Sequence, residues 1–510
     1  MITALPARRR SLLGAGTAQF AGQFLGLVLA VLVSHLIARR MGVGPQADAF
    51  LLGRRLVTAV TETLNQIVVS VYIPLIAAQA AAGAGIWHIV TRSGGGAFLT
   101  GTALAAVFIA GAPGIVASVA PDFDAETAAL ATRVIKLLSL ALPATVATVA
   151  LAAYCNVRDR FGAAAASRQL PRAAVAAALL LGTGRLAELA AGAYTLGAIM
   201  VTGVVMLMAV RLSRMAPVQA GPARAGSIAR RAAAAVVLAV GAMVVLWLET
   251  AVAAWTGPGG VAMLEYSQRL GALLGNTLAM ALTLVVFADL SRRSVAGETA
   301  QLDAQFTMSV WAGISLMLPV TAGMVANAPA IVDLVLGYGA FEVAEIRAEV
   351  VMLTRWMAVA PLGALVVRMM YIRVLADDTL PVVRVTLAAT VADLAIRAVL
   401  FRVLVPWLGL TGIPVALVAA PVGPVVIIAL WLRRRNIALD LRPLAASRPL
   451  MATSFLTSLA VVAGARLGQV SVGWTQMGGK GAALSTVLVS GLAGALVLSV
   501  AVLGFRVRLR

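Results

Sequence analysis

Residues 96–120 read GAFLTGTALAAVFIAGAPGIVASVA, a run of 25 residues without one charged side chain. A helix of about 20 apolar residues is long enough to cross the roughly 30 Å hydrocarbon core of a bilayer. The chain of 510 residues repeats segments of this kind along its whole length, and 61% of its residues are hydrophobic. A soluble domain usually contains about 45–50% apolar residues. The sequence therefore predicts a protein that crosses a membrane many times.

Counting these apolar segments gives about 14 transmembrane helices, and we expect an all-α polytopic membrane protein. The connections between the segments are short, so the sequence predicts no inserted soluble domain. The expected spans are Leu12–Ala38, Ala49–Ala78, Gly96–Ala120, Thr127–Tyr154, Ala163–Leu181, Ala187–Val210, Ala232–Trp255, Ala262–Phe287, Phe306–Ala326, Glu349–Ile372, Val382–Leu404, Leu408–Leu432, Leu450–Leu467 and Ala482–Gly504.

The formal net charge of +20 is unevenly distributed among the connections. In a soluble protein such a charge suggests nucleic-acid binding, but in a polytopic membrane protein Arg accumulates in cytoplasmic loops. Here the even-numbered connections are rich in Arg, whereas the odd-numbered ones are poor in Arg and often acidic, with Arg39 and Arg40 as the main exceptions. This pattern supports fourteen spans with both termini in the cytoplasm, and we expect no nucleic-acid partner.

Two short internal matches suggest a duplication of six helices. Arg55-Leu56 is followed by Glu62-Thr63-Leu64 in the second span, and Arg269-Leu270 is followed at the same spacing by Asn276-Thr277-Leu278 in the eighth. Similarly spaced Thr-Arg, Pro and Tyr residues recur in the fourth and tenth spans. An even offset implies a parallel repeat. We therefore predict two six-helix lobes, residues 1–220 and 221–440, followed by a helix pair in residues 441–510.

Several charged and polar side chains lie inside the expected spans. A charged residue at the centre of a membrane helix costs about 2.5–3.5 kcal/mol on insertion scales, so such residues normally face a cavity or a partner. The candidate substrate-binding residues are Arg54, Arg55, Glu62 and Asn65 in the second span and Glu265 and Arg269 in the eighth. Glu265 and Arg269 stand four residues apart, which favours an ion pair on one helix face.

Two interpretations of these charges stay open. They could be ion pairs that only stabilise packing between helices, which is the interpretation that we favour for Asp393 and Arg397 in the eleventh span. Arg55 and Arg269 correspond in the predicted repeat, and we expect them to face one another across a central cleft. Two guanidinium groups there would form an anion site, because Arg binds phosphate through a rigid bidentate fork. The substrate predicted in that case is anionic or amphiphilic.

The motifs of enzymes and metal sites are missing from the sequence. Cys155 is the single cysteine and His35 and His88 are the only histidines, so neither a disulfide nor a Cys- or His-based metal cluster is expected. The glycine-rich segments at 94–96 and 478–481 lack the spacing of a phosphate-binding loop. We expect a transporter without a metal or cofactor, and not an enzyme.

A series of short motifs resembles the MurJ/MviN lipid II flippase family, which belongs to the multidrug/oligosaccharidyl-lipid/polysaccharide exporter superfamily. The motifs occur in the same order over nearly the whole chain. They are Leu25-Gly26, the segments 38–42 (ARRMG), 47–50 (ADAF) and 72–74 (YIP), Asn156, Arg160-Phe161, and the segments 266–270 (YSQRL), 337–341 (GYGAF) and 378–381 (DTLP). The resemblance implies a MurJ/MATE-like fold and transport by alternating access in the bacterial cytoplasmic (inner) membrane.

The resemblance also implies a substrate and residue roles. The expected function is to flip a polyprenyl-diphosphate-linked saccharide, either lipid II or a related peptidoglycan or polysaccharide precursor. Arg269 matches a cavity arginine of the family, and Asp48 matches an acidic residue that would act in gating. The expected partners are the lipid-linked oligosaccharide, membrane lipid and a coupling cation. Gln23 and Leu29-Ala30 stand where the family has charged residues, which supports an alternative, a non-transporting scaffold of a glycan-synthesis complex. A cation-coupled multidrug exporter is the other alternative, and the cationic character of the expected cleft argues against it.

Overall fold

The computed structural model describes residues 26, 28–81, 86–157, 169–213, 225–296, 299–376, 381–434, 447–475 and 479–508, and these residues form helices joined by short turns. The predicted lobe boundaries near residues 220 and 440 lie outside the described residues, as do residues 12–25 of the first expected span and residues 163–168 of the fifth. The described part of the chain contains no strand. The predicted all-α class is therefore confirmed.

Each of the fourteen expected spans corresponds to a helix or to a broken pair of helices. The helices are residues 28–40, α2 Pro45–Ala81, α3 Ile86–Val119, α4 Ala125–Ser139, α5 Leu142–Val157, α7 Leu170–Leu181, α8 Leu186–Ser213, α9 Ala225–Trp255, α10 Gly260–Ala296, α11 Thr299–Leu336, α12 Ala344–Ala376, α13 Val382–Leu408, α14 Gly412–Ala419, α15 Val422–Arg434, α16 Arg448–Thr475 and α17 Gly479–Arg508. Within the described residues, nine helical segments are long and apolar enough to cross a membrane.

Two expected spans are interrupted near proline. The fourth span divides into α4 and α5 just before Pro143, and the twelfth divides into α14 and α15 at Ala420 and Pro421. A proline has no N–H to donate, and its ring clashes with the carbonyl four residues earlier. Pro361, in contrast, stays inside the unbroken helix α12. A proline in these spans thus permits a break without requiring one.

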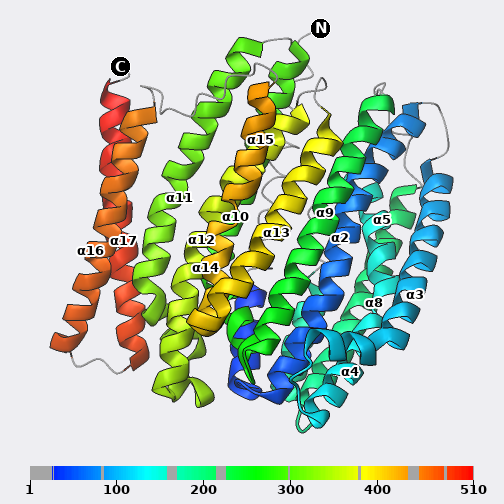
Figure 1. Cartoon of the computed structure of the whole chain (residues 1–510), viewed down its shortest axis with the longest axis horizontal. Helices are drawn as coiled ribbons and strands as arrows, with labels where there is room; N and C mark the ends of the chain where they lie inside the picture. The colour runs from blue at the N-terminus through cyan, green and yellow to red at the C-terminus, as the bar shows by residue number, and fades with distance from the viewer. Residues whose placement is uncertain are drawn as a thin grey trace. The chain divides into compact units, whose positions relative to one another are not determined.

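The chain forms two compact units, residues 1–262 and 263–510. In the first unit α2 contacts α4, α5, α8 and α9, and Figure 1 shows α2 and α9 side by side. In the second unit α11 contacts α12 and the C-terminal pair α16 and α17. Helix α9, which the predicted lobes assign to the second lobe, thus packs within the first unit. The division into two six-helix lobes and a C-terminal pair remains a prediction.

Small residues bring the helices close together within each unit. A Cβ atom at Gly101 of α3 would lie 2.7 Å from the Cα atom of Pro143 in α5. A Cβ atom at Gly271 of α10 would lie 2.5 Å from the carbonyl oxygen of Thr354 in α12. Membrane helices use such small residues because close approach of the backbones maximises van der Waals contact.

Candidate functional site

Asp48 lies in the first turn of α2 and is 2% exposed. Its carboxylate accepts hydrogen bonds from the backbone N–H group of Gly259, in the turn from α9 into α10, and from that of Ala262, in the first turn of α10. Gly257 and Gly259 have φ values of 116° and 85°, a backbone region that glycine enters without strain. Burial raises the pKa of Asp48 to about 6, while the two N–H donors act in the opposite direction. The predicted gating role of Asp48 remains a prediction.

Arg55 lies between α2 and α9 and is held by two side chains of α9. Its Nε atom donates a 2.9 Å hydrogen bond to Oγ1 of Thr250, and its Nη2 atom lies 3.3 Å from Oε2 of Glu249. The side chains of Arg55 and Glu249 are only 3% and 5% exposed. A buried charge needs a partner of this kind because the surroundings cannot solvate it. In this conformation the charge of Arg55 is therefore balanced by a carboxylate of the protein.

Two further hydrogen bonds join the same pair of helices. Nε1 of Trp247 donates to the carbonyl oxygen of Leu56 at 3.3 Å, and Oγ1 of Thr63 lies 3.2 Å from the carbonyl oxygen of Ala239. Phe108 of α3 packs edge-on against Trp247, with ring centroids 6.0 Å apart. Polar groups thus link α2 and α9 at several levels.

The other predicted residues of α2 have different surroundings. Arg54 is buried, and its guanidinium carbon lies 5.7 Å from the ring centroid of Phe50. Glu62 is exposed and Asn65 is half-buried. Residues that follow one another on a helix point about 100° apart, so Arg54 and Arg55 occupy different faces of α2.

The predicted ion pair of α10 is present in the second unit. Nε of Arg269 lies 2.9 Å from Oε1 of Glu265, and the two side chains are 27% and 9% exposed. Arg397 and Asp393 of α13 form the same kind of pair at 2.8 Å. Both pairs confirm the spacing argument. The predicted approach of Arg55 to Arg269 joins residues of different units and remains a prediction, as do the substrate-binding roles.

Glu249 and Thr250 are the site residues that the sequence analysis missed. Glu249 is the only charged residue between Ala232 and Trp255, so the cost of a charge in a membrane helix could have identified it. Within the described residues no three His, Cys, Asp or Glu side chains come together as a possible metal site.

Comparison with known proteins identifies the family. The family model "Lipid II flippase MurJ" matches residues 37–489, a range that includes every candidate residue above. The chain belongs to the MurJ lipid II flippase family. Members of this family are transporters, and this chain is accordingly a multi-pass membrane transporter rather than an enzyme. No curated protein matches the sequence.

Several solved structures of transporters have a fold similar to that of this chain. A structure titled "Lipid II flippase MurJ, inward closed conformation" has a TM-score of 0.72 and 13% sequence identity, covering 96% of this chain and 99% of that one. An inward-facing multidrug resistance MATE family transporter of the MOP superfamily has a TM-score of 0.66 and 14% identity, covering 81% and 95%. A MOP superfamily transporter from Pyrococcus furiosus has a TM-score of 0.62 and 16% identity, covering 84% and 96%. At these identities the likeness concerns the fold alone, and it confirms the MurJ/MATE-like architecture.

Proposed function

We propose that this protein flips a polyprenyl-diphosphate-linked saccharide, lipid II or a related peptidoglycan or polysaccharide precursor, from the cytoplasmic to the outer leaflet. The observation that carries the proposal is membership in the MurJ family over residues 37–489. The membrane is the bacterial cytoplasmic membrane, with both termini in the cytoplasm. The support for this orientation is the accumulation of Arg in the even-numbered connections.

In this proposal Arg269 and Arg55 bind the diphosphate. Each guanidinium already contacts a carboxylate of the protein, Glu265 or Glu249. A diphosphate offers more negative charge and more acceptor oxygens than one carboxylate, so it competes with that carboxylate for each guanidinium. Arg269 is the more accessible of the two, with 27% of its side chain exposed, and it would make the first contact.

Alternating access requires that the substrate bind one conformation better than the other. Asp48 supplies the proposed gate, because its carboxylate fastens the start of α2 to the turn that leads into α10. Breaking these two hydrogen bonds would release the turn. A diphosphate that contacts both arginines in only one state would supply the differential affinity.

The test is a flipping assay with the purified full-length protein in lipid vesicles. Fluorescent polyprenyl-diphosphate-linked saccharide in the outer leaflet should be translocated by the wild type and by Arg402→Ala, which removes an exposed arginine of α13. Loss of one charge-assisted contact costs about 1.5–3 kcal/mol, so Arg269→Ala should slow flipping about tenfold or more. A rate for Arg269→Ala equal to that of Arg402→Ala would contradict the proposed binding role.

One observation favours a second candidate, a scaffold of a glycan-synthesis complex that does not transport. Arg55 is already neutralised by Glu249 and almost fully buried. The double variant Arg55→Ala/Arg269→Ala separates the two candidates in a strain depleted of its own lipid II flippase. Growth rescued by wild type but not by the double variant, at equal amounts of protein in the membrane, supports the flippase. No rescue by either protein supports the scaffold, because a protein that does not transport cannot replace the missing flippase.

A further inference from the structure

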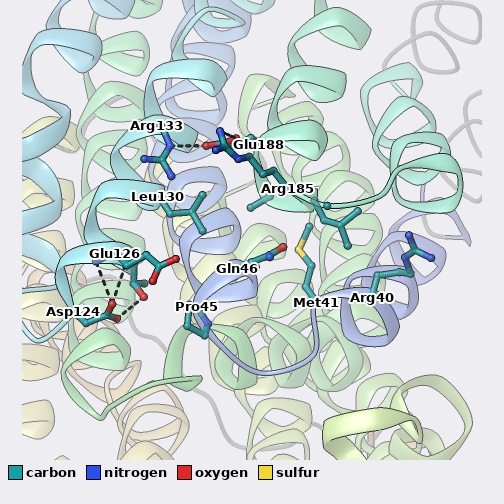
Figure 2. A pocket seen from close by; sticks show the side chains of 14 residues that line it. Arg40, Met41, Pro45, Gln46, Asp124, Glu126, Leu130, Arg133, Arg185 and Glu188 are labelled. Carbon is teal, nitrogen blue, oxygen red and sulfur yellow. Dashed lines mark hydrogen bonds and ion pairs between the residues drawn. The ribbon is translucent and has the colours of Figure 1, made fainter.

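A cavity of about 620 Å³ lies at one end of the first unit, among three turns of the chain. The turn before α2 contributes Arg40, Met41, Pro45 and Gln46, and the turn from α7 into α8 contributes residues 184–188. The start of α4 contributes Asp124, Glu126, Thr127, Leu130 and Arg133. Figure 2 shows these side chains around the opening. Ligand pockets commonly have volumes of about 300–1,000 Å³, so the cavity can hold a small molecule.

One wall of this cavity has an excess of positive charge. Nε of Arg133 lies 2.5 Å from Oε1 of Glu188, and Nη1 of Arg185 lies 3.7 Å from Oε2 of the same residue. Two guanidinium groups thus share one carboxylate, as Figure 2 shows. Arg40 also lines the cavity and donates to the carbonyl oxygen of Gly182, but in Figure 2 its guanidinium lies apart from Arg133 and Glu188. Much of Arg133 and most of Arg185 is exposed, so their remaining N–H groups can reach a ligand.

A second part of the lining is acidic. Asp124 caps α4, since its carboxylate accepts hydrogen bonds from the backbone N–H groups of Glu126 and Thr127 and from the Thr127 hydroxyl. The hydrogen bonds from the hydroxyl and the backbone N–H of Thr127 lower the pKa of Asp124. Glu126 lies in the first turn of α4 with its side chain exposed. In Figure 2 the pair Asp124 and Glu126 lies apart from Arg133 and Glu188, with Leu130 between them.

Arg40 and Arg185 lie in odd-numbered connections, which are otherwise poor in Arg, whereas Arg133 lies within α4. Arg40 is one of the two main exceptions to that charge pattern, and it lines the cavity together with Arg133 and Arg185. Arginine is disfavoured in the outer loops of a polytopic protein. A binding site at this end of the first unit would account for Arg40 and Arg185, the two arginines of the lining that depart from the charge pattern.

We propose that this cavity binds a short zwitterionic peptide, which carries an ammonium at its N-terminus and a carboxylate at its C-terminus. The lining has three basic residues (Arg40, Arg133 and Arg185) and three acidic ones (Asp124, Glu126 and Glu188). A simple anion would be repelled by Asp124 and Glu126, and a simple cation by the arginines. A zwitterion places its carboxylate beside Arg133 and Arg185 and its ammonium beside Asp124 and Glu126. Met41, Pro45 and Leu130 offer apolar contacts for peptide side chains.

The proposal goes beyond lipid flipping and is tested without it. The probe is alanyl-alanine, titrated into the purified full-length protein and followed by calorimetry. N-acetyl-alanyl-alanine lacks the ammonium, and alanyl-alanine amide lacks the carboxylate. Since each blocked form loses one set of charge-assisted contacts, both should bind about tenfold more weakly than the free dipeptide. Equal binding of all three forms, or no binding of the dipeptide, would overturn the proposal.

Two variants locate the binding site. Arg133→Gln and Glu126→Gln should each weaken dipeptide binding about tenfold. The matched control is Lys136→Gln, which removes an exposed charge one turn further along α4 and outside the cavity. Unchanged binding in Arg133→Gln and Glu126→Gln would place the peptide elsewhere and overturn the proposal. Phosphoethanolamine that competes as strongly as alanyl-alanine would assign the cavity to a lipid headgroup and overturn it too.

Discussion

At the scale of single residues, the buried contact between Arg55 and Glu249 has a measurable consequence for stability. Arg55→Ala removes the guanidinium and leaves a carboxylate that is only 5% exposed. Breaking a buried ion pair in this way costs about 3–5 kcal/mol, whereas replacing both partners by apolar residues is often nearly neutral. In detergent, the unfolding temperature should therefore fall strongly in Arg55→Ala and return close to the wild-type value in Arg55→Met/Glu249→Leu.

The control for this comparison is Arg185→Ala, since the side chain of Arg185 is 83% exposed beside Glu188. Exposed ion pairs contribute about 0–1 kcal/mol, so its unfolding temperature should stay close to that of the wild type. An Arg55→Ala variant as stable as Arg185→Ala would contradict the buried ion pair between Arg55 and Glu249.

Asp48 predicts a dependence of stability on pH. Its pKa is raised from 3.8 to about 6 in the folded protein, so the folded state keeps the proton over a pH range in which the unfolded chain has lost it. The resulting stabilisation is complete below pH 3.8 and is lost as the pH rises through about 6. Relative to Asp48→Asn, the wild type should lose about 2 kcal/mol between about pH 4.5 and 6.5. Unfolding of both proteins across this range measures the difference.

A pH-independent difference between the wild type and Asp48→Asn would contradict this account. The asparagine variant is a close match in shape, and its side-chain oxygen can still accept from the N–H groups of Gly259 or Ala262. It removes only the charge and its titration.

The residues of the site show where sequence reasoning is strong and where it stops. A charged residue in an apolar span can be recognised directly in the sequence. The ion pair of Glu265 and Arg269 follows from their spacing of four residues on a helix. The partner of Arg55 lies 194 positions away along the chain, and no local pattern connects the two residues. The same holds for Asp48, whose acceptor role depends on a turn more than 200 residues later.

At the scale of helices, the close contact of α16 and α17 predicts an unequal effect of two similar substitutions. A Cβ atom at Gly468 would lie 2.6 Å from the Cα atom of Thr486, and backbone cannot move aside cheaply. Gly468→Ala should therefore destabilise the protein by about 1–3 kcal/mol. At Gly491 of α17, in contrast, no atom lies within 4 Å of where a Cβ atom would be. Gly491→Ala should therefore be neutral or slightly stabilising, because Ala has a higher helix propensity than Gly. Unfolding in detergent compares the two, and equal effects would contradict the described contact.

Helix positions were predictable because a bilayer imposes a length and an apolar composition on each span. The interruptions were not predictable. Pro143 and Pro421 lie at breaks, whereas Pro361 lies within a continuous helix. The difference depends on how neighbouring helices accommodate the freed carbonyl groups, which is a property of packing rather than of local sequence.

At the scale of the whole molecule, sequence repeats and packing describe different things. The predicted duplication of six helices assigns α9, the seventh expected span, to the start of a second lobe. In the structure α9 packs against α2, because Arg55, Leu56 and Thr63 find their hydrogen-bond partners on it. A repeat records a duplication of sequence, and such contacts between helices can follow a different division.

The orientation in the membrane is also a prediction, and the single cysteine makes it testable. Cys155 is buried, so Cys155→Ala gives a cysteine-free background in which one new cysteine can be labelled. Asp122→Cys lies in the exposed turn between α3 and α4, and Arg433→Cys lies exposed in the last turn of α15. Nine expected spans separate the two positions, which therefore belong on opposite sides of the membrane. In intact cells a membrane-impermeant maleimide should label Asp122→Cys, and it should label Arg433→Cys only after permeabilisation. Labelling of both in intact cells would mean that the number of spans between them is even, and the reverse pattern would place the arginine-rich connections outside.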